Sequence, residues 1–366
     1  MADSTNPQAL LTSPTYHHHI TIQTSIPNGP RNISYTDFGC PTGPVLLFLP
    51  GMFASRFLGL PLHVLAERAG VRLIVIDRPG IGGSTGVRVE ERIDAWVDML
   101  PRFLEQLGIR RVSLVSHSAG TVYLLNTLAR CRGVVNREIF FLAPWVDPAH
   151  SHVTSMQMAQ YLPTKAFNLW HHIPRFFVTQ ASPMLASSGT MMRGISSVSL
   201  PGTNNNTQAE EDKTFLEANW RRIERDYGVP KEESAELSRL AVDAMFKEET
   251  VGANDEAIIC LRKGEAGSNW GACSDYRKCV KDLGETEQAA GRKLVVRAYF
   301  AEKDAMVGSK GQSYFEGCWR AEELQGIDFQ CRVVSGTDHD TVSQSVEVWE
   351  EILRAVKKAS QNHSLW

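Results

Sequence analysis

The sequence predicts an α/β fold built on a mainly parallel β-sheet with helices on both faces. Short apolar runs alternate with segments of helical spacing along two separate stretches of the chain. Most residues of these runs are apolar, as in 45–49 and 139–143, which is expected of strands that are buried on both faces. Strand-helix alternation of this kind is typical of a parallel sheet that is covered on both sides.

The first stretch opens with an expected antiparallel pair of strands. Residues 19–24 alternate Ile20 and Ile22 with polar neighbours, and residues 31–38 follow a turn that contains Asn28-Gly29. The elements expected after this pair are strand 45–49, helix 57–69, strand 71–76, helix 91–107, strand 112–115, helix 118–130 and strand 139–143.

A mostly helical insertion is expected to separate the two stretches. No central strand pattern is found between Trp145 and Lys293, and helices are expected at 210–227, 231–246 and 254–263. The strand-helix rhythm then resumes with strand 293–300, helix 311–323, strand 328–334 and a closing helix with one apolar face. We therefore expect core residues at 1–147, a helical cap insertion at 148–290 and further core residues at 291–366.

Composition and charge exclude several classes of partner. The formal net charge of -3 mixes both signs along the chain, which leaves no basic field for nucleic acid or an anionic membrane. The apolar runs are far shorter than the roughly 20 residues of a transmembrane helix. A polar first segment without a secretory pattern predicts a cytoplasmic protein, and the seven cysteines are expected to be free thiols. No pattern indicates a metal, a cofactor or an oligomeric state.

One strand-to-helix junction carries the strongest signal for chemistry. An apolar strand ends in Ser116-His117-Ser118-Ala119-Gly120 and continues as an apolar helix. A serine exposed on such a turn needs small residues two positions before and after it, because the backbone is crowded and strained there. Ser116 and Gly120 meet this need and favour Ser118 as a nucleophile, whereas a Ser116 nucleophile would place Leu114 at a crowded position. The alternative is a serine-rich strand end that only caps the helix.

This junction resembles the nucleophile turn of the α/β-hydrolase superfamily, in particular its cytosolic, cap-bearing serine hydrolases of the AB hydrolase-1 type. The resemblance covers about 45–147 and 293–359 and implies an eight-stranded sheet. The amide of Ala119, at the N-terminus of the following helix, is expected to be one oxyanion donor. Pro50-Gly51-Met52 stands where the family carries a His-Gly loop, which implies Met52 as the second donor, with Phe53 as its neighbouring alternative.

Residues 77–84, Asp-Arg-Pro-Gly-Ile-Gly-Gly-Ser, closely match a turn that follows the fourth strand in this superfamily. The resemblance implies a structural role. A phosphate-binding loop is not expected, because the turn lacks a Gly-Lys-Ser/Thr ending.

The resemblance also implies an acid and a histidine, in that order, each directly after a late strand. Asp304 follows strand 293–300, and His339 follows strand 328–334. Glu302 is a weaker substitute for the acid, and Asp147 is a further alternative because some members carry the acid after the sixth strand. The carboxyl ends of parallel strands are where open sheets of this kind place their sites, so the three side chains are expected to converge.

Together these residues predict a carboxylesterase-like enzyme that acts on a small to medium apolar substrate without a cofactor. Ser118 would attack an acyl carbon, His339 would accept its proton, and Asp304 would orient His339. A serine nucleophile disfavours the epoxide-hydrolase and haloalkane-dehalogenase chemistries of the fold. With an ordinary histidine pKa of roughly 6.5, activity is expected to fall below about pH 6.

The expectation of an apolar substrate comes from the inserted segment, whose first part is rich in methionine and aromatic residues. Such side chains suit an acyl chain or a ring, although they also form ordinary helix-packing cores. They are Met156, Met158, Tyr161, Phe167, Trp170, Phe176, Phe177, Met184, Met191 and Met192.

Two other functions remain open from the sequence. One is a ligand-binding protein that keeps the fold without turnover, because a fold does not by itself establish an activity. The other is acyl transfer or carbon-carbon bond cleavage by the same three residues.

Overall fold

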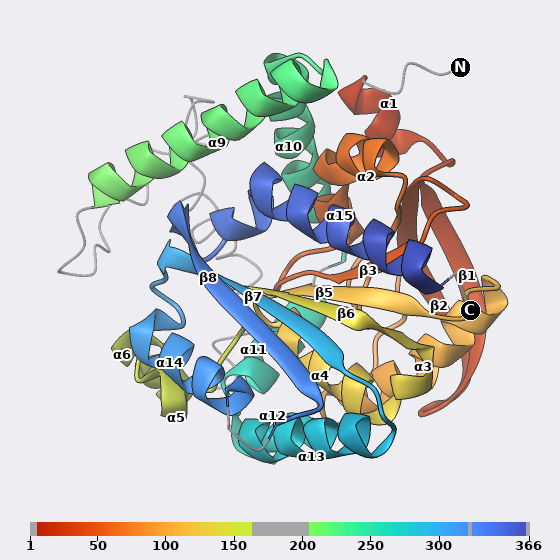
Figure 1. Ribbon diagram of the computed structural model, residues 1–366, viewed down its shortest axis with the longest axis vertical. Helices are drawn as coiled ribbons and strands as arrows, with labels where there is room; N and C mark the ends of the chain where they lie inside the picture. Colours follow the sequence, from red (N-terminus) through yellow and green to blue (C-terminus); the bar gives the residue numbers. More distant parts are fainter. Residues whose placement is uncertain (1–5, 163–204, 250, 321–323, 364–366) are drawn as a thin grey trace.

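The computed structural model describes residues 6–162, 205–249, 251–320 and 324–363 of the chain. Its centre is one eight-stranded sheet in the order β1-β2-β4-β3-β5-β6-β7-β8 (Figure 1). Only β2 runs antiparallel to its neighbours, and every other adjacent pair is parallel. The predicted mainly parallel sheet is confirmed. The strands are β1 (His17–Ser25), β2 (Asn28–Gly39), β3 (Val45–Leu49), β4 (Arg72–Ile76), β5 (Val112–His117), β6 (Val135–Leu142), β7 (Leu294–Lys303) and β8 (Ile327–Asp338).

Both faces of the sheet are covered by helices, as predicted. The helix α2 (His63–Ala69) and the closing helix α15 (Val346–His363) lie on one face, and α3 (Arg92–Gln106), α4 (Gly120–Arg130) and α14 (Gly308–Trp319) lie on the other (Figure 1). Successive residues of a strand divide between these two cores because strand side chains alternate in direction. In β4, Ile74 packs with the α3 and α4 side, and Val75 packs with the α2 and α15 side.

The described part of the segment between β6 and β7 is mostly helical, as predicted. The expected helices at 210–227, 231–246 and 254–263 correspond to α9, α10 and α11, and four further helices were not expected. The described helices of this segment are α5 (Pro148–Ser151), α6 (Thr154–Tyr161), α9 (Asn205–Tyr227), α10 (Lys231–Met245), α11 (Val251–Cys260), α12 (Gly264–Ser268) and α13 (Tyr276–Ala289).

These inserted helices are distributed over both sides of the sheet. In Figure 1, α9 and α10 lie beyond α2 and α15, whereas α11, α12 and α13 lie on the side of α3 and α4. Val280 and Leu283 of α13 belong to the same hydrophobic cluster as the residues of α3 and α4. The insertion therefore contributes to the main core as well as to the outer layer.

The methionine-rich and aromatic part of the insertion is described only at its beginning. Met156 packs against the core, whereas Met158 and Tyr161 are 67% and 88% exposed. The other members of that set, from Phe167 to Met192, lie outside the described residues.

The remaining elements are short helices. They are α1 (Pro7–Thr12) and the 3₁₀ helices η1 (Arg56–Leu62), η2 (Val89–Glu91), η3 (Arg132–Val134), η6 (Gly271–Ser274) and η7 (Thr341–Gln344).

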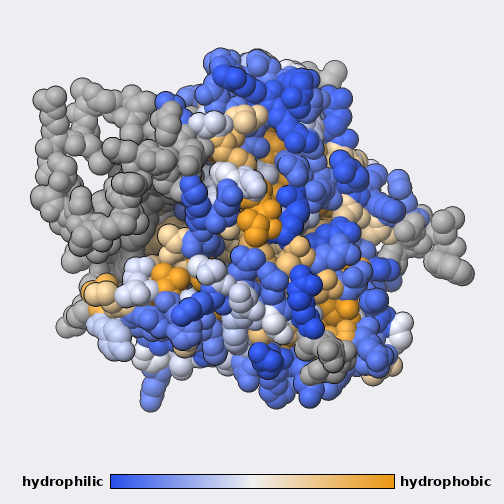
Figure 2. Space-filling model, turned by 60° about the vertical axis from the view of Figure 1, so that its left-hand side comes forward, coloured by the Kyte–Doolittle hydropathy of each residue, from blue (hydrophilic) through white to orange (hydrophobic). Residues whose placement is uncertain are grey.

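Figure 2 shows one face of the molecule, on which hydrophilic residues predominate and apolar residues form small, separate patches. No helix among the described residues has the length and apolar character needed to cross a bilayer. All seven cysteines lie in the described part of the chain and are free, as predicted.

Candidate active site

Ser118 lies on a tight turn between β5 and α4, and its backbone is in the left-handed region with φ 47°. Non-glycine residues rarely adopt this conformation, and it is often found at functional sites. The turn requires a glycine at position 120, because a Cβ atom there would lie 2.1 Å from the carbonyl oxygen of Leu49. Ser116, two residues before Ser118, is fully buried, and its hydroxyl has no hydrogen-bond partner among the described residues.

The structure brings Ser118, His339 and Asp304 together from the carboxyl ends of β5, β8 and β7. The Nε2 atom of His339 lies 2.7 Å from the Ser118 hydroxyl, and its Nδ1 atom lies 2.8 Å from a carboxylate oxygen of Asp304. The other carboxylate oxygen of Asp304 accepts hydrogen bonds from the amides of Met306 and Val307 at 2.9 and 2.8 Å. The three side chains form a continuous series of hydrogen bonds. The backbone turn at Met306 and Val307 fixes Asp304 at one end of this series.

Burial and neighbouring charges set the pKa values of Asp304 and His339. Burial opposes ionisation of Asp304, but the charge and hydrogen bond of His339, together with two amides, bring the pKa of its carboxyl below the usual value. Burial also disfavours the imidazolium, yet the Asp304 carboxylate outweighs it and raises the pKa of His339 to about 9. The expected activity limit near pH 6 assumed a histidine without this neighbour, and the Asp304 carboxylate holds the pKa of His339 above that assumed value.

The two alternative acids occupy other positions. Asp147 caps α5 by accepting from the Ala149 amide at 2.9 Å and forms an ion pair with Arg262 at 2.6 Å. Glu302 accepts a hydrogen bond from the amide of Gly336 at 2.7 Å. Neither carboxylate bonds to His339 in the described residues, and Asp304 holds that position instead.

Of the two amides predicted to stabilise an oxyanion, that of Ala119 directly follows Ser118, and that of Met52 belongs to the loop after β3. A Cβ atom on Gly51 would lie 3.3 Å from the Cβ of Ser118, so the loop after β3 packs directly against the serine. Within the described part of the chain, the amides of Met52 and Ala119 donate no hydrogen bond to another residue. Backbone N–H groups without such a partner are able to donate to an oxyanion. Phe53, the alternative donor, has a positive φ of 67°.

His117, directly before the serine, is a site residue that the sequence did not single out. Its Nε2 atom lies 2.8 Å from the backbone carbonyl oxygen of His339. Burial, and then the nearby His339, lower the pKa of His117 to about 3, so the ring is neutral and its Nε2 carries the proton. The ring thus ties the nucleophile turn to the loop that carries His339. Its position beside the predicted nucleophile was the only signal in the sequence.

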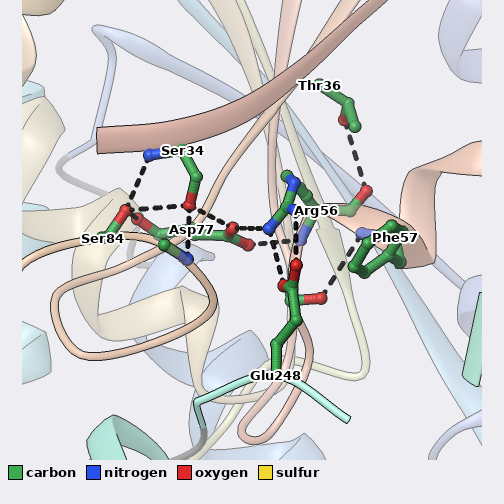
Figure 3. A network of polar contacts seen from close by, with 9 residues as sticks. Ser34, Thr36, Arg56, Phe57, Asp77, Ser84 and Glu248 are labelled. Atoms are coloured by element: carbon green, nitrogen blue, oxygen red, sulfur yellow. Dashed lines mark hydrogen bonds and ion pairs between the residues drawn. The ribbon is translucent and has the colours of Figure 1, made fainter. Parts of the chain in front are cut away.

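The glycine-rich turn after β4 is bonded to Arg56, the first residue of η1. Asp77 accepts hydrogen bonds at 2.5 Å from both the backbone amide and the side chain of Arg56, and a third at 2.5 Å from Ser34 (Figure 3). Glu248, from the inserted segment, forms a second ion pair with Arg56 at 2.6 Å. These contacts connect β2, β4, η1 and the insertion, which is the structural role that the resemblance implied.

A mainly apolar pocket lies elsewhere in the molecule, between η1, α2, α9, α10 and the beginning of α15. Leu58, Leu62, Trp220, Ile223 and Leu237 are among its lining residues, and Ser118 is not. The described residues also include no group of three His, Cys, Asp or Glu side chains placed to hold a metal ion.

Comparison with known proteins identifies the family. The model of the alpha/beta hydrolase family matches residues 46–351, and since this is most of the sequence, the chain belongs to that family. No curated protein sequence matches the chain.

Solved structures with the same fold include two esterases and an epoxide hydrolase. A carboxylesterase from the thaumarchaeon Nitrososphaera gargenis is 14% identical with a TM-score of 0.54, over 94% of this chain and 100% of that one. A thermophilic esterase from Thermogutta terrifontis is 13% identical with a TM-score of 0.52, over 93% and 99%. An epoxide hydrolase from Vigna radiata is 16% identical with a TM-score of 0.55, over 94% and 99%. At these identities the similarity shows the fold.

Proposed function

We propose that this member of the alpha/beta hydrolase family is a serine hydrolase that cleaves small to medium apolar carboxylic esters through an acyl-enzyme intermediate. The observation that carries the proposal is the hydrogen-bonded chain from Ser118 through His339 to Asp304. A hydroxyl, an imidazole and a carboxylate in this order form the arrangement that activates a serine for attack on an acyl carbon.

In the first half of the reaction, the Ser118 oxygen adds to the ester carbonyl carbon while its proton moves to Nε2 of His339. The carbonyl oxygen gains the negative charge and accepts hydrogen bonds from the amides of Met52 and Ala119. Asp304, which bonds to Nδ1, stabilises the imidazolium and keeps the ring in the required orientation. When the intermediate collapses, the bond to the leaving alcohol breaks and the alcohol takes the proton from His339.

In the second half, water releases the acyl group. Neutral His339 accepts a proton from water as the water oxygen attacks the acyl carbon, and the same two amides stabilise the second oxyanion. Collapse breaks the bond to the Ser118 oxygen, which recovers its proton from His339. The products are a carboxylic acid and an alcohol.

An apolar substrate is supported by the side chains beside the proposed oxyanion loop. Phe53, Ile81 and Ala253 form a separate buried hydrophobic cluster, against which Met52 and Phe246 pack. Ala253 and Phe246 belong to the inserted segment. We propose that residues 148–290 act as a cap, whose described part supplies one apolar wall beside the loop that carries Met52.

A serine-directed fluorophosphonate tests the nucleophile. Wild-type protein should be labelled at one residue, and Ser118→Ala should not be labelled. The matched control is Ser116→Ala, which removes a hydroxyl two residues away and should keep the labelling. Equal labelling of Ser118→Ala and wild type, measured by intact-protein mass spectrometry, would remove Ser118 from the proposed role.

The bond that is cleaved is tested by product analysis. Wild-type protein should release acid and alcohol from short-chain aryl and alkyl esters faster than it acts on lactones or β-diketones of similar size. Turnover of the diketones alone would replace ester hydrolysis with carbon-carbon cleavage by the same residues. Tight ligand binding that is unchanged in Ser118→Ala, without turnover, would favour a binding protein.

A further inference from the structure

Arg78 is buried beneath the loop that carries the proposed oxyanion donor. Its guanidinium donates to the carbonyl oxygen of Pro50 at 2.6 Å and to that of Gly51 at 2.8 Å. Its other hydrogen bonds go to Glu256 of α11, whose two carboxylate oxygens lie 2.5 and 2.7 Å from Arg78 nitrogens. Both side chains are at most 1% exposed. One arginine therefore holds two consecutive backbone carbonyls and is itself fixed by a bidentate ion pair.

These contacts fix the direction of the amide of Met52. The carbonyl of Gly51 and the N–H of Met52 belong to the same planar trans peptide, in which the two groups point in opposite directions. When Arg78 holds the Gly51 oxygen, the N–H of Met52 must point away from Arg78. A flipped peptide would present a carbonyl oxygen to the oxyanion instead of a donor and would oppose the reaction.

The loop needs such a restraint because of the residue at position 51. A Cβ atom there would lie 2.7 Å from Nδ1 of the His117 ring, so only glycine fits. Glycine has more conformational freedom than any other residue. Within the loop, the amide of Ala54 donates to the Gly51 carbonyl at 3.1 Å. Arg78 adds a second, charged donor to the same carbonyl from outside the loop.

Glu256 brings the inserted segment into this arrangement. The Arg92 guanidinium lies 3.4 Å from a Glu256 oxygen, and the Tyr123 hydroxyl donates to the same oxygen at 3.2 Å. The backbone beside it is also docked, since the Gly252 amide donates to the carbonyl of Gly80 at 2.9 Å. The packing of α11 against the core therefore sets the position of Glu256, and Glu256 in turn sets the position of Arg78.

We infer that Arg78 is a positioning residue that orients the Met52 amide for oxyanion stabilisation, and that Glu256 of the inserted segment holds Arg78 in place. The inference rests on the proposed function for its chemical consequence. The ordering of the loop by Arg78 is independent of that function and can be measured separately.

The paired variant Arg78→Met/Glu256→Gln tests the inference, because it removes both charges of the pair, while the buried Arg92 keeps Asp255 as an ionic partner at 3.4 Å. The matched control is Arg132→Met/Glu287→Gln. Arg132 also forms a bidentate pair with a buried glutamate, at 2.8 Å for both contacts, and donates to a backbone carbonyl, that of Val135. It lies after α4, at the opposite end of that helix from Ser118.

Loss of one oxyanion donor lowers kcat by about 10² to 10³. We expect this fall in the variant at 78 and 256, with KM changed by less than about threefold because ground-state binding is kept. Amide hydrogen exchange over residues 50–56 should become at least about tenfold faster, since a restrained loop becomes free to open. The control variant should keep its kcat and its exchange in this loop, even where its melting temperature falls.

Two results would overturn the inference, and a third would overturn only the proposed function. Unchanged loop exchange in the variant at 78 and 256, or an equal loss of kcat in both paired variants, would overturn the inference. Wild-type protein with neither labelling nor turnover would remove the proposed function alone, because loop exchange still shows whether Arg78 orders the loop. If the paired variant does not fold, Arg78→Lys takes its place. Lysine keeps the charge but offers three N–H donors instead of five, too few for all these contacts.

Discussion

The two sides of the candidate site use charge in different ways. On the proton-transfer side, formed by Ser118, His339 and Asp304, a proton must move during turnover, and the ring of His339 has a pKa of about 9. On the fixed-charge side, formed by Arg56, Asp77, Arg78, Glu248 and Glu256, arginines are paired with carboxylates around the loop after β3. In the proposed function, the first side carries out the proton transfer, and the second holds the backbone loop that stabilises the oxyanion.

The two sides also differ in how their residues are brought together. Each member of the proton-transfer side directly follows a strand, so the sheet alone places it. The fixed-charge side joins consecutive residues of one turn, Asp77 and Arg78, to the inserted segment. Asp77 fixes the loop at its Arg56 end, and Arg78 fixes it at its Pro50 end. Loss of a residue on the proton-transfer side should therefore affect the rate, whereas loss at the Arg56 end of the fixed-charge side should affect mainly the stability.

The largest effect on rate is expected from Asp304→Asn. An asparagine keeps the shape of the side chain but no longer stabilises the imidazolium or selects its tautomer, and such a change lowers kcat by about 10⁴. Steady-state kinetics on an aryl ester measure the effect. A loss of less than tenfold would mean that Asp304 does not orient the base.

The corresponding change on the fixed-charge side, Asp77→Asn, should act mainly on stability. It leaves the buried Arg56 guanidinium with an incomplete set of partners, and breaking a buried pair in this way costs about 3–5 kcal/mol. Because Asp77 does not contact the reacting groups, kcat per folded molecule should fall far less than in Asp304→Asn. Urea unfolding monitored by fluorescence measures the loss.

Asp94→Asn is the control for this second change. Asp94 forms an ion pair with Arg130 in which both side chains are more than a third exposed. Exposed pairs contribute only about 0–1 kcal/mol. If Asp77→Asn cost no more than Asp94→Asn, the contacts of Figure 3 would not hold the loop.

The sequence revealed one side of the site better than the other, for a physical reason. Ser118, Asp304 and His339 each follow an apolar strand, and local patterns show where such strands end. Nothing local connects Arg78 with Glu256, which is 178 residues away and lies in a helix whose start was placed three residues late. A pair of opposite charges so far apart has no signature in one sequence.

The helices show the same difference between elements that local patterns predict and elements that they do not. Helices whose apolar stripe faces one core were predicted within a few residues, as in α3 and α4. Helix α13 was missed, although Val280 and Leu283 pack in the main core, because its position within a long helical insertion gives no sign that it returns to the sheet.

The pH dependence of turnover should come from the proton-transfer side. Only the neutral ring of His339 can accept a proton, so a raised pKa means that activity is present above about pH 9 and is lost as the pH falls through it. We expect kcat/KM to decrease about tenfold per pH unit below that value. In Asp304→Asn the carboxylate charge is gone, so the break should move to lower pH. A break that does not move would locate the titrating group elsewhere.

Stability should show the opposite trend with pH in the same pair. A folded-state pKa raised above the unfolded value means that the protonated ring stabilises the fold, fully below about pH 6.5 and less as the pH rises through about 9. The melting temperature of wild type should therefore fall over this range more than that of Asp304→Asn. Activity and stability would then change in opposite directions between neutral and alkaline pH.

The smallest effect is expected at Ser116, which lies beside the proton-transfer side without taking part in it. Its buried hydroxyl has no partner among the described residues, and an unsatisfied buried group of this kind destabilises a protein by about 1–3 kcal/mol. Ser116→Ala removes the hydroxyl and keeps the Cβ, so the protein should become slightly more stable while kcat stays within about threefold of wild type. Ser116→Gly should recover less stability, because glycine in a strand costs about 0.5–1 kcal/mol relative to alanine. A large loss of kcat in Ser116→Ala would show that the hydroxyl acts on its neighbour Ser118, and the contrast between the two serines would disappear.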